Sequence, residues 1–410
     1  YRHMPPVVQL LSAATLAVSA VAHPPVLHAG VRVIPEAHWR ASACAHADRV
    51  RSLLEPGMLP PAPACLTKKG LPSSRASTPA DGWRPLDSAH PVFNFFEQYY
   101  GVAGGKGTRR LARWSAPVGE GGCAVLLEGA TASDMGSGTL HLRGATVVEA
   151  GEVGPAGVLY DPVASRPPSL DATPFLWHRA VLAATTAAEP VTHCYGLHEW
   201  AMQYWPEGAP EPPSARYQSG AMRLRVSRST LNAAVETGVS CTHVDALRFF
   251  APAAAMYNRH GGRLERSDQL RLEQPGCVHA HMDLLKAAIR LSPWLAADLL
   301  GDCLEIALAA RALDVAASPY DASAFGLRAI HVETASGRSE YREEQLKLMH
   351  AAAPVRARLL AAFDSYLSSA FTPDQLAAAA AHPKDERFAV ATPAGPPWRR
   401  AMLPRPPPPA

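Results

Sequence analysis

Apolar and polar residues recur with the period of an α-helix in residues 278–291, directly after the turn Pro275-Gly276. The stripe expected to face the core contains Val278, Met282, Leu285 and Ile289. The opposite, polar stripe contains His279, Asp283, Lys286 and Arg290. A spacing of four residues places His279 and Asp283 one turn apart on one face, where a histidine and a carboxylate can act together. His281 points in another direction and is expected to take no part.

Similar periodicity predicts helices along most of the chain. The expected helices are residues 34–55, 93–100, 175–188, 240–255, 293–315 and 339–371. The inward face of the third of these is expected to carry Leu176, Val181 and Ala184. Ser292 and Pro293 are typical of the N-cap and the first position of a helix, and Pro354 is expected to break the last helix.

The glycine-rich segment 118–174 contains short pieces that resemble strands. These pieces are CAVLLEG, TLHLRG, ATVVEAG and GVLYD. Their length favours a small hairpin or an irregular cover over a large sheet. The predicted class is therefore mainly α, a multi-helix globular domain with a minor irregular β and loop cover.

Three segments are expected to lie outside this domain. Residues 1–34 have the composition of a leader or a disordered segment, 58–87 that of a loop insertion, and 372–410 that of a Pro-rich disordered tail. A single helical domain at 35–371 remains. The acid-poor run 5–22 is compatible with organellar targeting, with a cytoplasmic location as the alternative, and it is too weakly hydrophobic for a membrane span.

Charge and cysteine content narrow the function classes. A net charge of +3 over 410 residues argues against a dedicated nucleic-acid surface, although a local basic patch stays compatible with it. The seven cysteines are odd in number and include no CxxC pair, which disfavours a disulfide framework and a cysteine-based zinc site. Free, mostly buried thiols are expected.

A second polar segment contains His193, His198 and Glu199. The pair His198-Glu199 begins like the zinc-protease motif HExxH, but Met202 stands where that motif needs its second histidine, so the motif is excluded. His198 and Glu199 are candidates for a ligand, an acid or a base. The alternative is a histidine packed beside Trp200, with a solvated glutamate.

A third segment, Thr242–Asp245, fits the capping box of a helix start. Asp245 would then have a structural role. His243 would lie in the first turn, where the helix dipole lowers the pKa of an imidazole. A neutral His243 would suit a ligand or a general base.

A divalent metal could bind these segments if the fold brings them together. The candidate ligands are His193, His198, His243 and His279. No short spacing among them indicates a particular metal. Cys194, Cys241 and Cys277 each adjoin one of the polar segments, so a cysteine nucleophile is a further alternative.

Long motifs across residues 36–365 resemble a family of actinobacterial proteins commonly labelled 3-methyladenine DNA glycosylase. They include HWRASACAHADRVRSLLEP, CYGLHEWAMQY, CTHVDALRFF, EQPGCVHAHMDLLKAAIRLSP and ADLLGDCLEIALAARALDVAASPYD. The resemblance implies hydrolysis of an N-glycosidic bond, with a nucleobase or other small molecule as substrate and DNA as a partner. The chain departs from the family pattern in longer ends, in a Pro-rich insertion and at His281. The segment QPGC is also not the phosphate-binding hairpin of helix-hairpin-helix glycosylases.

The expected function is that of an enzyme with a histidine-rich polar pocket. Its candidate catalytic residues are His198, Glu199, His243, Asp245, His279 and Asp283. Asp283 or Glu199 would orient or activate His279 or His198 as a general base. Two alternatives stay open, a metal-dependent hydrolase or oxidase that uses the same histidines and a non-catalytic helical binding protein.

Overall fold

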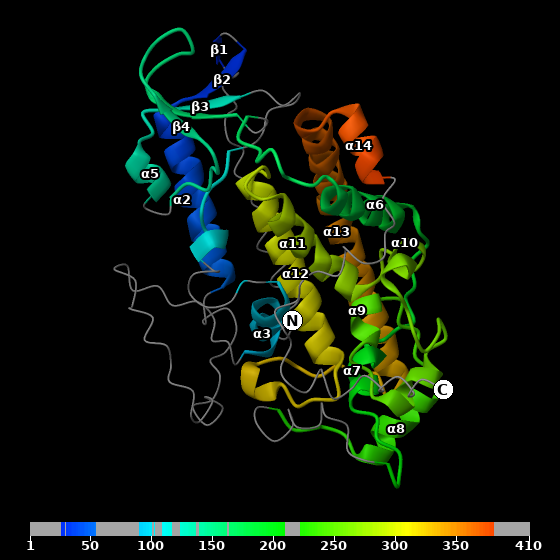
Figure 1. The fold of residues 1–410 in the computed structure, drawn as a ribbon. Helices are drawn as coiled ribbons and strands as arrows, with labels where there is room; N and C mark the ends of the chain where they lie inside the picture. Colours follow the sequence, from blue (N-terminus) through cyan, green and yellow to red (C-terminus); the bar gives the residue numbers. More distant parts are fainter. Residues whose placement is uncertain are drawn as a thin grey trace.

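A computed structural model describes most of the chain (Figure 1). The described residues are 26–28, 30–54, 90–100, 102, 109–116, 124–136, 139–161, 164–209 and 222–380. The predicted loop at 58–87, the acid-poor run at 5–22 and the tail beyond residue 380 lie outside them. Within the described chain the class is mainly α with a small sheet, as the sequence predicts.

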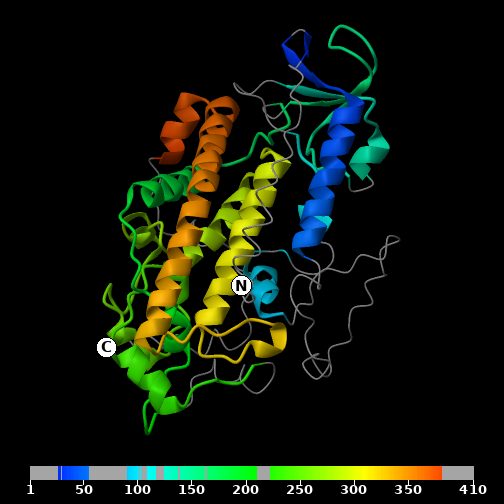
Figure 2. The ribbon, with the colours of Figure 1, turned by 180° about the vertical axis from the view of Figure 1, so that it is seen from behind.

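Three long helices form the centre of the fold, namely α11 (Val278–Leu291), α12 (Ala297–Ala317) and α13 (Ala335–Ala370). Helix α12 lies between its neighbours and is buried along nearly its whole length, because alanine and leucine occupy most of its positions. It packs most extensively against α11 and also against α13. Figure 2 shows α12 and α13 side by side, with α2 (Glu36–Leu53) on the other flank.

Shorter helices cover this centre. They are α3 (Pro91–Tyr99), α5 (Ala132–Gly136), α6 (Thr173–Ala187), α7 (Leu197–Met202), α8 (Arg228–Glu236), α9 (Val244–Leu247), α10 (Gln269–Leu272) and α14 (Pro373–Ala380). Helix α6 lies across α13, and α3 contacts α12. Helices α7, α8 and α9 gather at the end of the bundle that is remote from the sheet (Figure 1).

A five-stranded sheet caps the other end of the molecule. Its strands are β1 (Val26–His28), β2 (Val31–Ile34), β3 (Val125–Glu128), β4 (Thr146–Val148) and β5 (Gly157–Tyr160), in the order β1-β2-β3-β5-β4. The pairs are antiparallel except β2 with β3. Trp39 of α2 donates a hydrogen bond from Nε1 to the Glu128 carbonyl at 2.9 Å, which ties α2 to the sheet.

The structure extends the domain at both ends beyond the predicted limits of 35 and 371. Strand β2 comes from the expected leader, where Val31 and Val33 are buried against Leu126. Helix α14 comes from the expected tail and packs on α6. Both segments are short, so their burial depends on neighbours that the local pattern does not reveal.

Several helix limits differ from the prediction. Helix α12 begins at Ala297 with Ala296 as its N-cap, and Ser292 is the C-cap of α11, so Ser292 is not the N-cap of the next helix. Helix α13 continues through Pro354. Fully buried Leu348 and Leu359 flank that position, and their packing outweighs the hydrogen bond that proline cannot make, about 3 kcal/mol.

Helices α6 and α9 also differ from the prediction. The buried residues of α6 are Thr173, Phe175, Trp177, Leu182 and Thr185. Of the predicted inward face, Leu176 packs partly buried against the core, but Val181 and Ala184 are not among the buried residues. The aromatic side chains set the orientation of this helix, because they bury the most apolar surface. The long helix expected at 240–255 is limited to the single turn of α9 and a later 3₁₀ segment.

The burial of α12 predicts the cost of removing a side chain from it. Leu304→Ala should lower the free energy of unfolding by about 2–5 kcal/mol, because the change leaves a cavity at a position that is 1% exposed. Met256→Ala, at a position that is 79% exposed, should change it by no more than about 0.5 kcal/mol. Urea unfolding of both variants measures this, and equal losses would contradict the described core.

Candidate functional site

The three polar segments meet in the interior, where their imidazole rings form a row. His279 of α11 lies in the middle. Its ring centre is 4.5 Å from that of His198 on α7 and 4.7 Å from that of His243, and it stacks on His243 with an interplanar angle of 20°. All three side chains are buried. The fold therefore brings together segments that are separated by more than thirty residues in the chain.

Helix α7 carries His198 and is held firmly against α12. Trp200 donates a hydrogen bond from Nε1 to the Ala317 carbonyl at 2.9 Å. Gly196, the residue before α7, has φ +67, and a Cβ there would lie 3.2 Å from the Ala317 methyl group. A left-handed backbone in such a close contact favours glycine. The turn thus lets α7 approach α12 closely enough for His198 to reach that helix.

Two amide side chains fix the loops that carry the other histidines. Asn258 accepts a hydrogen bond from the backbone N–H of Cys241 at 3.0 Å and donates one to its carbonyl at 3.2 Å, which sets the strand-like segment before His243. Gln274 accepts from the N–H groups of Val191 and Gly276, both at 2.7 Å, which sets the turn before α11.

Asp314 of α12 lies against one end of the histidine row. Its Oδ1 atom is 2.8 Å from Nε2 of His198, and both groups are buried. The two atoms are close enough for an ion pair, yet neither has a partner with the angles of a hydrogen bond. Arg311 contacts the other carboxylate oxygen and also donates to Glu199 at 2.7 Å. Asp314 and Arg311 were not among the site residues predicted from the sequence.

The charges around Asp314 decide its protonation state. Burial raises the pKa of this carboxyl, but the opposite charges of His198 and Arg311 outweigh burial and hold the pKa well below its ordinary value. Burial and the neighbouring His198 and His243 lower the pKa of His279 well below the usual range. An ionised carboxylate and a neutral imidazole are the forms that bind metals.

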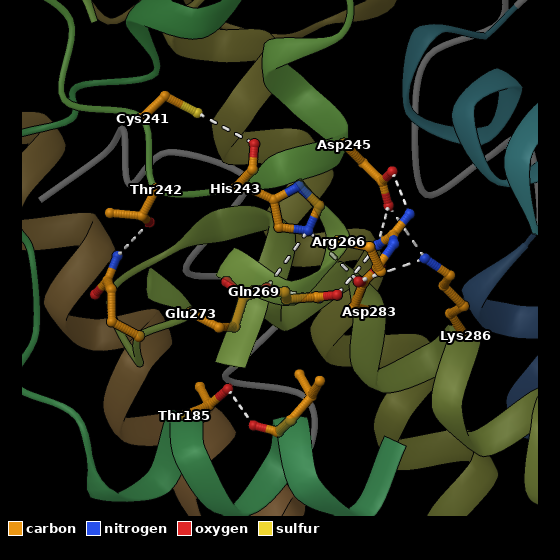
Figure 3. A network of polar contacts seen from close by, with 12 residues as sticks. Thr185, Cys241, Thr242, His243, Asp245, Arg266, Gln269, Glu273, Asp283 and Lys286 are labelled. Carbon is orange, nitrogen blue, oxygen red and sulfur yellow. Dashed lines mark hydrogen bonds and ion pairs between the residues drawn. The ribbon is translucent and has the colours of Figure 1, made fainter. Parts of the chain in front are cut away.

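His243 faces two carboxylates at the other end of the row (Figure 3). Its Nε2 atom is 3.5 Å from Asp283 Oδ2 and 3.6 Å from Glu273 Oε2. Burial lowers the pKa of His243, but Glu273 and Asp283 outweigh burial and raise it. The predicted lowering by a helix dipole is therefore wrong, because α9 is a single turn and the carboxylates are nearer.

Asp283 and Glu273 are both held by further hydrogen bonds. Tyr100 donates to Asp283 Oδ1 at 2.6 Å, and Lys286 lies 3.6 Å from its other oxygen. Gln269 donates to Glu273 at 2.9 Å. Asp283 thus points to α3 and to His243, although its sequence position suggested a pair with His279.

Asp245 does not close a capping box. His243 is the N-cap of α9 and makes no side-chain cap. The Asp245 carboxylate contacts Arg248, accepts two hydrogen bonds from Arg266 at 2.7 and 3.1 Å, and lies 3.4 Å from Lys286. Burial raises the pKa of Asp245, but Lys286, Arg266 and neighbouring cations outweigh burial and lower it.

Two other histidines differ in burial, because His193 is exposed and His281 is buried. His193, a predicted ligand, is exposed and belongs to neither group of potential metal ligands in the described chain. His281 was expected to have no partner in the site, but it is fully buried and its Nδ1 atom lies 3.1 Å from Nη2 of Arg356 on α13. The free thiols Cys241 and Cys277 are buried, and burial raises their pKa, which disfavours a nucleophilic role.

A cavity of about 70 Å³ adjoins this network between α6, α11 and α13. It has room for a few water molecules or a small ligand. Glu273 and Asp283 form part of its wall, so the carboxylates that contact His243 also face the cavity. Trp177 and His178 line the α6 side.

Two groups of side chains in the described chain could hold a metal ion. The potential ligand atoms of His198, His279 and Asp314 lie within 4.8 Å of one another, and so do those of His243, Asp245 and Asp283. Three cations, Arg248, Arg266 and Lys286, contact Asp245 in the second group, whereas one cation, Arg311, contacts Asp314 in the first. The first group is therefore the better metal site.

Comparison of the chain with protein-family models, with curated proteins and with solved structures finds no match. No helix in the described parts of the chain has the length and apolar character that crossing a bilayer requires.

The cation cluster around Asp245 predicts a pH-dependent stability. Asp245→Asn should lower the free energy of unfolding at pH 7 by about 1–3 kcal/mol, because three cations lose their shared carboxylate. Since the folded-state pKa of Asp245 is lowered, this stabilisation is present above about pH 4 and declines as the pH falls below that value. Unfolding at several pH values tests this.

A matched control is Asp364→Asn, which breaks an exposed pair with Arg179. It should cost less than about 1 kcal/mol. If Asp245→Asn costs no more than this control at pH 7, the cation cluster does not stabilise the site as described.

Proposed function

We propose that the protein is a metal-dependent hydrolase whose metal is held by His198, His279 and Asp314. The observation that carries the proposal is the buried cluster of His198, His279 and Asp314, whose potential ligand atoms lie within 4.8 Å of one another. His198 Nε2 and Asp314 Oδ1 are 2.8 Å apart and form an ion pair without the angles of a hydrogen bond. A cation that all three side chains coordinate would fit this arrangement.

The types of ligand agree with this proposal. Two imidazoles and one carboxylate form the protein ligand set of several zinc hydrolases, and they leave a coordination position for water. The same set also holds iron in non-haem oxygenases. The wall of the neighbouring cavity includes six charged side chains beside its apolar ones, which suits a polar substrate and water. We therefore favour hydrolysis.

Other residues have roles that follow from their contacts. Arg311 contacts Asp314, and Glu199 accepts a hydrogen bond from Arg311, so this pair orients the carboxylate ligand. His243 stacks on His279 and faces Glu273 and Asp283. These three groups can move a proton between the metal site and the cavity, and His243 is the proposed general acid and base.

A second candidate is the N-glycosidic hydrolase that the family resemblance implies. The observation in its favour is that Asp283 and Trp177 line one cavity. An aromatic ring can stack on a base, and a carboxylate can assist its release. This candidate needs no metal, so removal of the metal separates it from the first.

Metal analysis of the purified chain tests the first candidate. About one divalent ion per chain is expected, and His279→Ala or Asp314→Asn should reduce the bound metal to below about a tenth because each removes one of three ligands. His193→Ala is the matched control, since this histidine is exposed, and it should retain the metal. Full metal retention in both ligand variants would contradict the proposal.

Release of a base from alkylated DNA tests the second candidate. If the metal centre carries the activity, protein treated with a chelator should lose its hydrolytic activity and should release no base. Base release that persists in chelated protein and disappears in Asp283→Asn would instead establish the glycosidase.

A further inference from the structure

The cavity beside α11 contains more positive than negative charge. Its wall includes four cations, Arg266, Lys286, Arg290 and Arg356, but two carboxylates, Glu273 and Asp283. Lys286 lies near both Asp283 and Asp245, and Arg266 binds Asp245 with two hydrogen bonds. Figure 3 shows these paired groups above α6. The other two cations of the wall are Arg290 and Arg356.

Arg356 of α13 is more unusual than Arg290, because its side chain is buried. It is 2% exposed, and its nearest polar contact is the Nδ1 atom of His281 at 3.1 Å. An arginine can only donate, so His281 accepts this bond as a neutral imidazole. The Nε atom of Arg356 is buried without a hydrogen-bond partner, and no carboxylate of the described chain lies within ion-pair distance.

A buried guanidinium without a counter-ion is costly, because burial removes its hydration. Burial lowers the pKa of Arg356, and the more distant Glu273 compensates only in part. Arg290 is exposed on α11 and likewise has no ion pair within the described chain. It lies two turns beyond Asp283, where the cavity meets solvent. The two arginines thus add two uncompensated charges to one cavity.

The partly buried His178 lies on the α6 side of the same cavity. Burial, together with Lys286 and Arg290, lowers the pKa of His178 to about 3. This histidine is therefore neutral at pH 7. It can donate one hydrogen bond into the cavity without adding charge.

We propose that the cavity is an oxyanion site, in which Arg356 and Arg290 bind a dianionic phosphate group of the substrate. Two uncompensated arginines match two negative charges, and a planar guanidinium can bind two phosphate oxygens at once. The assignment of the phosphate to the substrate rests on the function proposed above. Asp283 and Glu273 would then lie between that phosphate and His243.

Calorimetric titration of the full chain with inorganic phosphate near pH 7.5 tests the site. Saturable binding at one site per chain is expected. Arg356→Gln should weaken it by about 10-fold to 100-fold, because each charge-assisted bond that is lost has this magnitude. Arg290→Gln should also weaken it, and this exposed position keeps the test valid if the buried variant does not fold. Arg179→Gln, at an exposed residue outside the cavity, should bind phosphate as the parent does.

Two further binding measurements complete the test. Acetate should bind at least about 10-fold more weakly than phosphate, because a monoanion satisfies one arginine instead of two. Phosphate binding should persist in His279→Ala, which removes a proposed metal ligand, so failure of the metal centre and failure of the oxyanion site are distinguishable. No phosphate binding, equal binding of acetate, or unchanged binding in both Arg290→Gln and Arg356→Gln would overturn the proposal.

Discussion

The buried charge of Asp314 is the constraint on which the rest of the site depends. Its side chain is fully buried on α12, the most central helix of the bundle. An isolated carboxylate there would cost several kcal/mol, so the fold must place opposite charge beside it. Arg311 supplies part of that charge from the preceding turn, and His198 approaches from α7. The contact between His198 and Asp314 therefore holds the short helix α7 against α12.

The same requirement extends through the histidine row to the cavity. His279 lies between His198 and His243, and His243 faces the carboxylates of Glu273 and Asp283. These groups are buried, Asp283 only partly, and they contact one another in place of solvent. Replacing one member therefore leaves a neighbour unpaired, which makes such networks sensitive to mutation. An enzyme can use this arrangement, because the groups that would react are already fixed in place.

The helices were predictable from sequence because their periodicity is strong, and α2, α3, α6 and α11 begin or end within a few residues of the predicted limits. Predictions failed where tertiary contacts outweigh local pattern. Pro354 does not break α13, because the flanking leucines are buried in the core. Strands β1 and β2 are short, and β3, which pairs with β2, follows about ninety residues later in the chain.

The convergence of His198, His243 and His279 was predictable as a hypothesis, since each belongs to a polar segment with an unusual pattern. The partners of these histidines were not. Asp314 lies within an alanine-rich helix where no spacing marks it as special, and Asp245 matched a capping box that does not form. Arg356 lies on the longest helix as one of many arginines, and its burial becomes evident only from the packing of α13.

X-ray absorption at the edge of the metal bound to the purified chain tests whether His198, His279 and Asp314 hold that metal. We expect a first shell of light atoms that includes two imidazole nitrogens at about 2.0–2.1 Å, with the outer-shell scattering typical of histidine rings. In His198→Ala the absorption edge of the bound metal should fall to below about a tenth, because this change also removes one of three ligands. A shell of sulfur ligands, or one of water oxygen without imidazole scattering, would contradict a metal centre built from His198, His279 and Asp314.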